Sequence, residues 1–175
     1  MSNLEENIID NILECFAKLG YTNTAINFYY PITSLLVLLD CDKEHLDDAI
    51  DDFKKRAADT LGNITIEELT SERGRYEIVI PISGVEWVHN NYKPTVFLES
   101  FISEIQKPNR TLEDMVGMFR SFSQDIIIDM LKDDMWAISF RDKTIDKYIY
   151  LIEQNEFGLQ YHRFTSREFE DIKNT

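Results

Sequence analysis

Apolar residues recur every three or four positions along several stretches of the chain, which is the spacing of helices with one buried face. Residues 3–19 form the first such stretch, with Ser2 and Glu5 placed to cap it and Gly20 placed to end it. Residues 42–61 give the clearest stripe, followed by Gly62, and their acids precede their bases as the helix dipole favours. The spacing and capping residues predict further helices over 83–90, 94–107, 111–122 and 165–172.

Other stretches alternate apolar and polar residues, which is typical of strands. Residues 64–69 and 76–80 predict a hairpin that turns at 72–75. Three further strands, over 135–141, 147–153 and 157–164, predict a C-terminal meander. In the second of these strands Tyr148 and Tyr150 alternate with Ile149 and Leu151, so we expect helices or another subunit to cover both of its faces.

Two segments fit more than one structure. Residues 31–39 fit a short buried helix opened by Pro31 or a buried strand, because short apolar runs do not discriminate. Within residues 123–133, Ile126 and Met130 continue the helical stripe that reaches Phe122, although Ile126, Ile128 and Met130 also alternate as a strand would. We predict a helix there.

The order of these elements indicates the fold class. Strands and helices do not alternate regularly, which argues against a doubly wound parallel sheet. We predict an α+β fold in which several helices pack with a small antiparallel sheet, made of one hairpin and the three-stranded meander. A single domain over residues 1–175 is expected, and the loop at 107–110 is the best candidate for a boundary within it.

Charge and composition narrow the possible partners and the compartment. The formal net charge is −14, which disfavours binding to nucleic acids and to anionic membranes. Cys15 and Cys41 form no C-x-x-C pair, so reduced thiols are expected. The acidic start carries no secretory signal, and the apolar stretch 32–39 is far shorter than the roughly 20 residues of a membrane span. We expect a soluble cytoplasmic protein.

Three acidic motifs could bind metals, and each has a structural explanation. Glu86 and His89 form one E-x-x-H pair, whereas a di-iron bundle needs two pairs and two further glutamates. The segment 40–44 resembles the start of a calcium loop, but His45 stands where that loop needs glycine. The third motif is a set of aspartates that would share one wet helix face, namely Asp125, Asp129, Asp133 and Asp134. No metal site is predicted.

The cysteines, histidines and aromatic residues do not indicate a particular activity. Cys15 lies beside a helical stripe and is expected to be a buried, inert thiol. Alternation places His162 on the strand face opposite Tyr161 and Arg163, where a structural role or exposure is expected. Aromatic side chains suit either the core or an anchor for a protein partner; they are Phe28, Tyr29, Tyr30, Trp87, Tyr92, Trp136, Tyr148, Tyr150 and Tyr161.

The N-terminal part of the chain resembles a known family. Leu19-Gly20-Tyr21, Tyr29-Tyr30-Pro31 and Ser34-Leu35 are similar to the N-terminal pattern of a family of small bacterial proteins of unknown function. The resemblance implies a bacterial cytoplasmic protein of similar length, and it assigns no activity, cofactor or partner.

The sequence therefore leaves catalytic residues unassigned and predicts no cofactor. We expect a non-catalytic protein-interaction or regulatory domain that binds another protein or itself. The alternative is a small-ligand-binding protein or enzyme with an acidic site. An acidic mimic of nucleic acid is a third possibility, which would need the carboxylates in one surface stripe.

Overall fold

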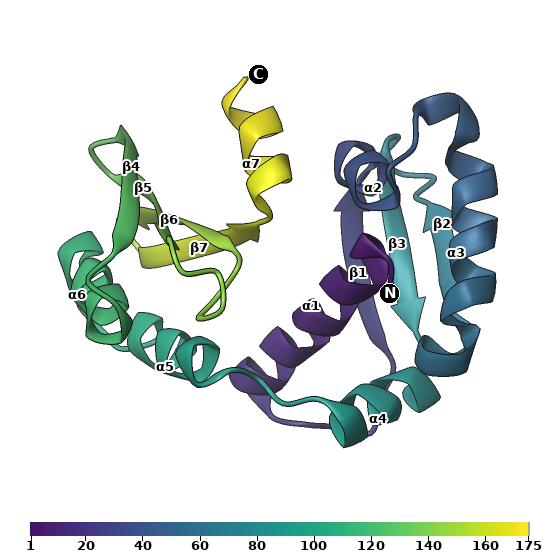
Figure 1. Cartoon of the computed structure of the whole chain (residues 1–175), viewed down its shortest axis with the longest axis horizontal. Coiled ribbons are helices and arrows are strands. Elements are labelled where there is room, and N and C mark those ends of the chain that lie inside the picture. Colours follow the sequence, from purple (N-terminus) through teal and green to yellow (C-terminus); the bar gives the residue numbers. More distant parts are fainter. Residues whose placement is uncertain (175) are drawn as a thin grey trace. The chain divides into compact units, whose positions relative to one another are not determined.

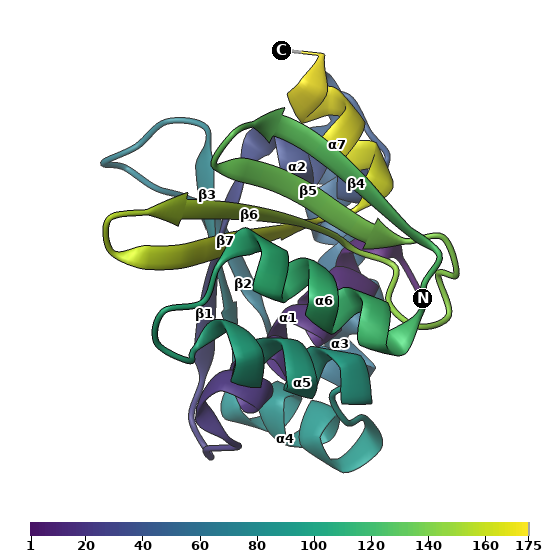
Figure 2. The same ribbon diagram turned by 90° about the vertical axis from the view of Figure 1, so that its left-hand side faces the viewer.

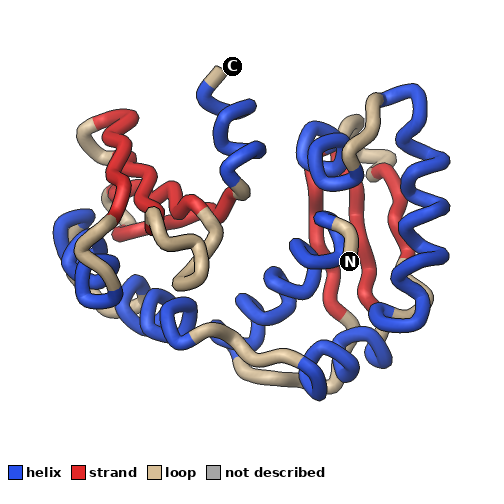
Figure 3. The backbone as a smooth tube through the Cα atoms, viewed as in Figure 1, coloured by secondary structure: helices blue, strands red, loops and turns tan. Residues whose placement is uncertain are grey.

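The computed structural model describes residues 1–174. They divide into two compact units, residues 1–94 and 95–174, each with its own sheet and its own core (Figures 1 and 3). The division falls next to Pro94, and the loop 107–110 lies inside the second unit. The expectation of a single domain stays a prediction, which the number of unfolding transitions tests.

The N-terminal unit contains four α-helices, one 3₁₀ helix and three strands. In chain order they are α1 (Asn3–Leu19), β1 (Ile26–Pro31), α2 (Ile32–Leu39), the 3₁₀ helix η1 (Lys43–His45), α3 (Leu46–Leu61), β2 (Thr65–Glu68), β3 (Arg75–Ile80) and α4 (Ile82–Asn91).

The N-terminal sheet is antiparallel, in the order β1-β3-β2. Ile78 of β3 lies opposite Ile66 of β2 and Phe28 of β1, and these side chains face the helices. Because successive strand residues point to opposite faces, Tyr29 and Glu67 lie on the other, solvent-exposed face. The unit is therefore a helical layer packed on one face of a sheet.

Short-range sequence patterns correctly predicted how α1 begins and ends and which residues of α3 are buried. The Ser2 hydroxyl accepts a hydrogen bond from the Glu5 backbone N–H at 3.2 Å, and Gly20 ends α1 with a φ of 78°. The predicted stripe of α3 is confirmed, since its five buried residues are the ones expected: Leu46, Ile50, Phe53, Ala57 and Leu61.

Two predictions for this unit need correction. Pro81, not Ser83, precedes the first turn of α4, because its fixed φ fits a helix start and Ser83 lies inside the helix. Strand β1 was missed, because aromatic residues there obscure the alternation of Ile26, Phe28 and Tyr30 toward the core. The segment 31–39, which was left open, is helix α2.

The C-terminal unit contains α5 (Val96–Ile105), α6 (Leu112–Phe122), β4 (Ile126–Lys132), β5 (Met135–Phe140), β6 (Ile149–Asn155), β7 (Gly158–Phe164) and α7 (Ser166–Lys173). Its sheet is an antiparallel meander in the order β4-β5-β6-β7. Capping boxes open α6 at Thr111 and α7 at Thr165, as predicted.

The helix predicted over residues 123–133 is wrong. Residues Ile126–Lys132 form β4, so the meander has four strands instead of three. Three consecutive β-branched residues, Ile126 to Ile128, favour a strand, and pairing with β5 supplies the backbone hydrogen bonds. The segment is therefore a seven-residue strand that leads into a tight turn, and α6 ends at Phe122 instead of continuing.

Helices cover the C-terminal sheet on both faces (Figure 2). On one face, α5 and α6 bury an aromatic cluster in which the Phe97 ring lies 4.8 Å from Phe140 and 5.0 Å from Phe119. On the opposite face α7 buries Phe169, and Lys173 binds Asp129 of β4 at 2.6 Å. Helices of the same unit therefore pack on both faces of this sheet, and Ile149 and Leu151 of β6 are half-buried.

Both units thus combine helices with a small antiparallel sheet, which confirms the predicted α+β class.

Candidate functional site

The E-x-x-H pair lies on the exposed side of α4. The His89 ring stacks on Tyr21, with the ring centroids 3.8 Å apart and the planes 4° from parallel. Glu86 and His89 are both exposed. Within residues 1–174, no group of three or more His, Cys, Asp or Glu side chains is arranged to hold a metal ion.

The segment resembling a calcium loop is a capped helix start. The Asp42 carboxylate accepts hydrogen bonds from the His45 backbone N–H at 3.0 Å and from the His45 ring at 2.6 Å, and these bonds lower the pKa of Asp42. Burial raises the pKa of the neighbouring Cys41 thiol, which disfavours the nucleophilic thiolate. Asp40, Cys41, Asp42 and His45 line a shallow depression of about 460 Å³.

The four aspartates of residues 125–134 do not share one helix face. Asp125 pairs with Arg141 at 3.0 Å, and Asp129 pairs with Lys173 at 2.6 Å. Asp133 and Asp134 form the turn between β4 and β5. The strand separates these carboxylates, so they make no common site.

The remaining sequence candidates, Cys15 and His162, lie on α1 and β7. Cys15 is half-buried on α1, where full burial was expected. His162 is exposed on β7 while Tyr161 and Arg163 are half-buried, so the predicted alternation is confirmed. Cys15 and His162 belong to different units, and within each unit the structure shows no nucleophile–histidine pair among these residues.

A buried polar cluster that the sequence analysis missed lies at the start of β6. The Tyr150 hydroxyl donates a hydrogen bond to Asp146 at 2.7 Å, and the same carboxylate accepts from the Tyr148 backbone N–H at 2.8 Å. The Arg163 guanidinium lies 4.5 Å from the centre of the Tyr148 ring. The sequence did contain a signal for this turn, because in Asp146-Lys147-Tyr148 the Asp146 carboxylate stands two residues before a backbone N–H that it can bind.

This cluster has the properties of a structural support. Burial, together with the negative charge of Asp146, raises the pKa of Tyr150 well above its ordinary value, so the phenol stays protonated. The ring is enclosed by aromatic neighbours, with Phe101 at 4.5 Å and Phe119 at 5.5 Å. The cluster therefore fastens the loop before β6 to the sheet.

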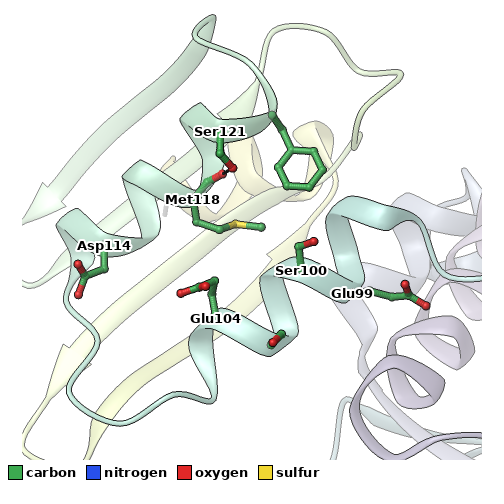
Figure 4. Close-up of a pocket in the computed structure, with 8 residues that line it drawn as sticks. Glu99, Ser100, Glu104, Asp114, Met118 and Ser121 are labelled. Atoms are coloured by element: carbon green, nitrogen blue, oxygen red, sulfur yellow. Dashed lines mark hydrogen bonds between the residues drawn. The ribbon is translucent and has the colours of Figure 1, made fainter.

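The groove between α5 and α6 has a volume of about 620 Å³ (Figure 4). Glu104 and Asp114 flank one end, while Ser100, Ser121 and the Met118 thioether lie toward the other (Figure 4). The complete lining is Glu99, Ser100, Ser103, Glu104, Asp114, Met118, Ser121 and Phe122.

Internal partners engage several polar groups of this groove. Glu104 binds Lys107 at 2.7 Å and Arg110 at 3.4 Å, and the Lys107 hydrogen bond is the main cause of its lowered pKa. The backbone N–H of Thr111 donates to Asp114 at 3.0 Å and lowers the pKa of that carboxyl. Both acids are ionised near neutrality, which suits binding of a cation better than proton transfer.

Exposed apolar side chains are a feature of β4. Ile127 is 38% exposed, Met130 is 63% exposed and Leu131 is 37% exposed. Ile127 and Met130 project from opposite faces of the strand, and we refer to the three residues together as the β4 patch. Sequence reasoning missed the patch because it placed this segment in a helix, where the apolar positions would have formed a buried stripe.

The fold and these sites define a two-sheet α+β protein with an open helical groove and an apolar sheet edge. The chain belongs to the family described as "Domain of unknown function, E. rectale Gene description (DUF3877)", whose model matches residues 1–173. This confirms the resemblance to a bacterial family of unknown function. No curated protein and no solved structure matches the chain.

Proposed function

We propose that this protein is a non-catalytic protein-interaction or regulatory domain that binds another protein or a second copy of itself. The observation that carries this proposal is the β4 patch, where three large apolar side chains are exposed on one strand at the edge of a sheet. Exposed apolar surface at a sheet edge is typical of sites where a protein partner adds a strand.

The distribution of charged groups supports binding over catalysis. Asp42, Glu104, Asp114 and Asp142 all have lowered pKa values because hydrogen bonds from neighbouring groups stabilise their charged forms. General acid–base catalysis near neutrality needs a carboxyl with a raised pKa instead. The Tyr150 phenol, whose pKa is raised well above its ordinary value, is enclosed in the C-terminal core.

The alternative is a small-ligand site in the α5–α6 groove. Its carboxylates and hydroxyls suit a cationic ligand such as an amine. A thermal-shift screen with amines, divalent metals and nucleotides tests this alternative. A ligand present at 100 times its Kd stabilises the protein by about 2.7 kcal/mol. We expect no such shift, and a saturable shift that Glu99→Gln abolishes would favour the alternative.

We place this domain in the bacterial cytoplasm. Within residues 1–174, none of the helices is both long enough and apolar enough to cross a membrane. The net charge of −14 keeps phosphate polymers and anionic lipids away, which leaves proteins as the favoured partners.

The test of the proposal compares two substitutions of equal charge change. Met130→Lys alters the β4 patch, whereas Phe157→Lys alters an apolar side chain that is 86% exposed at the β6–β7 turn. Partners captured by cross-linking in cells would be purified and titrated against each variant by calorimetry, with the chain itself included as a partner. We expect Met130→Lys to weaken binding by about ten-fold or more and Phe157→Lys to leave it unchanged. Equal effects of the two variants would refute the role of the patch.

A further inference from the structure

The two sheets have four edge strands, and three of them carry features that block the addition of another strand. Strand β1 ends at Pro31, which has no backbone donor, and the four-residue β2 carries Glu67 and Glu68. Strand β7 carries His162 and Arg163. Strand β4 instead begins with three isoleucines, and its charged residues, Asp129 and Lys132, and the bulge between Met130 and Lys132 all lie in its second half.

The backbone of β4 presents hydrogen-bonding groups along its outer edge. The Arg141 N–H donates to the Asp125 carbonyl at 3.2 Å, so the groups of Asp125 point toward β5. In an antiparallel pair, the backbone N–H and C=O groups of successive residues point alternately toward and away from the partner strand. The backbone groups of Ile127 and Asp129 therefore also point toward β5, and the backbone groups of Ile126, Ile128 and Met130 point away from it. The Ile126 N–H is satisfied by the Gln124 carbonyl at 3.2 Å. In residues 1–174, β4 has no strand partner other than β5.

This edge is complementary to itself. If a second β4 runs antiparallel and is centred on Ile128, the Ile128 N–H meets the Ile128 carbonyl of the other copy. The Met130 N–H meets the Ile126 carbonyl, which is an acceptor even though the Ile126 N–H is already used. Ile128 then faces Ile128, and Ile126 faces Met130, so the side chains on this face of the joined sheet pair as apolar groups.

The charge of the edge is compatible with the same arrangement. In this register Ile127 faces Asp129 of the second copy, and each Asp129 binds its own Lys173 at 2.6 Å in an exposed ion pair that offsets its negative charge only in part. The two carboxylates are therefore not brought face to face. Each copy carries a net charge of −14, so long-range repulsion opposes association and added salt weakens that repulsion.

We propose that β4 pairs with β4 of a second copy of this chain, antiparallel and centred on Ile128, and so joins two C-terminal sheets into one continuous sheet. This inference rests on the proposed function as an interaction domain and names the partner. A single pair of short strands is a small interface, so a Kd in the micromolar range is expected.

The test is sedimentation velocity on the full chain from about 1 to 500 µM, at low and at physiological salt. We expect the mass to rise with concentration from 20.6 kDa toward about twice that value, and to rise sooner at the higher salt.

Two substitutions at one position separate pairing from folding. Ile127→Glu places a carboxylate opposite Asp129 of the second copy and is expected to weaken the dimer by about ten-fold or more. Ile127→Lys places a cation there and is expected to keep the Kd within about three-fold of the unmodified chain. Both remove the same apolar side chain, so a defect in folding would affect them alike.

Met130→Pro provides a backbone test, because it removes an N–H that points away from β5. It is expected to abolish the dimer while leaving the circular dichroism spectrum unchanged. If Met130→Pro is misfolded, the comparison of Ile127→Glu with Ile127→Lys still tests the pairing of β4 with β4.

A chain that remains a monomer at every concentration would overturn this inference. A dimer that tolerates both Ile127→Glu and Met130→Pro would overturn the β4 pairing while leaving self-association, and with it the proposed function, intact. A monomer that nevertheless binds a different protein through the β4 patch would likewise overturn the inference alone.

Discussion

The substitution Gly84→Ala adds one methyl group and tests how closely α4 packs against the end of α3. It lies in α4, and a Cβ atom there would overlap the carbonyl oxygen of Leu61 at the end of α3. The same atom would lie 2.8 Å from the Leu61 carbonyl carbon and 2.9 Å from Ile80 Cγ2, whereas ordinary contacts measure 3.4–4 Å. The obstructing atoms belong mainly to backbone, so Gly84→Ala cannot be accommodated by turning one side chain.

Two opposing effects set the change in unfolding free energy that Gly84→Ala causes. Replacing glycine by alanine within a helix normally stabilises it by about 1 kcal/mol. Overpacking a core normally costs about 1–3 kcal/mol, and here α4 must also move away from α3. We expect Gly84→Ala to destabilise the N-terminal unit by about 2 kcal/mol, which lowers the Tm of a unit of this size by roughly 8–16 °C.

Gly117 provides the matched control. It lies in α6, and its added Cβ would meet no atom within 4 Å. Gly117→Ala is expected to stabilise the C-terminal unit by about 0.5–1 kcal/mol, because only the helix preference changes.

Urea unfolding followed by tryptophan fluorescence measures both variants. Trp87 lies in the N-terminal unit and Trp136 in the C-terminal unit, so Trp87→Phe and Trp136→Phe backgrounds report on the units separately. Coincident transitions would support the predicted single domain, and separate transitions would oppose it. If Gly84→Ala stabilises the protein as much as Gly117→Ala does, the close approach of α4 to Leu61 is refuted.

The other predictions concern the C-terminal unit. Tyr150→Phe removes a hydrogen bond to the buried Asp146 carboxylate and is expected to cost about 1.5–3 kcal/mol in urea unfolding; an unchanged midpoint would contradict the support role of this pair. The lowered pKa values of Glu104 and Asp114 mean that their charged forms stabilise the fold above the unfolded pKa of about 4, and that this contribution is lost as the pH falls through the lower folded values. Unfolding at pH 7 and at pH 3 should therefore show a loss at pH 3, and Asp114→Asn should reduce that loss.

Local sequence signals predicted much of the helical structure. The capping residues Ser2, Thr111 and Thr165 occupy the expected helix starts, and the α3 stripe is buried as its spacing indicated. These features depend on residues within one or two helical turns of each other, so a short window of sequence contains the information.

Candidate sites were harder to predict because their partners are distant in sequence. Asp129 binds Lys173, and the buried Tyr150 lies against Phe101 of α5. The sequence analysis placed Asp129 on a helix face with other aspartates, and only the pairing of β4 with β5 separated them.

By itself, the sequence determined the α+β class, the positions of most helices and the acidic character. Tertiary structure alone decided that residues 26–31 and 126–132 are strands, and that the second of these leaves an apolar edge exposed. The physical reason is that a helix closes its hydrogen bonds within its own segment, whereas a strand exists only when a distant segment supplies the opposite edge.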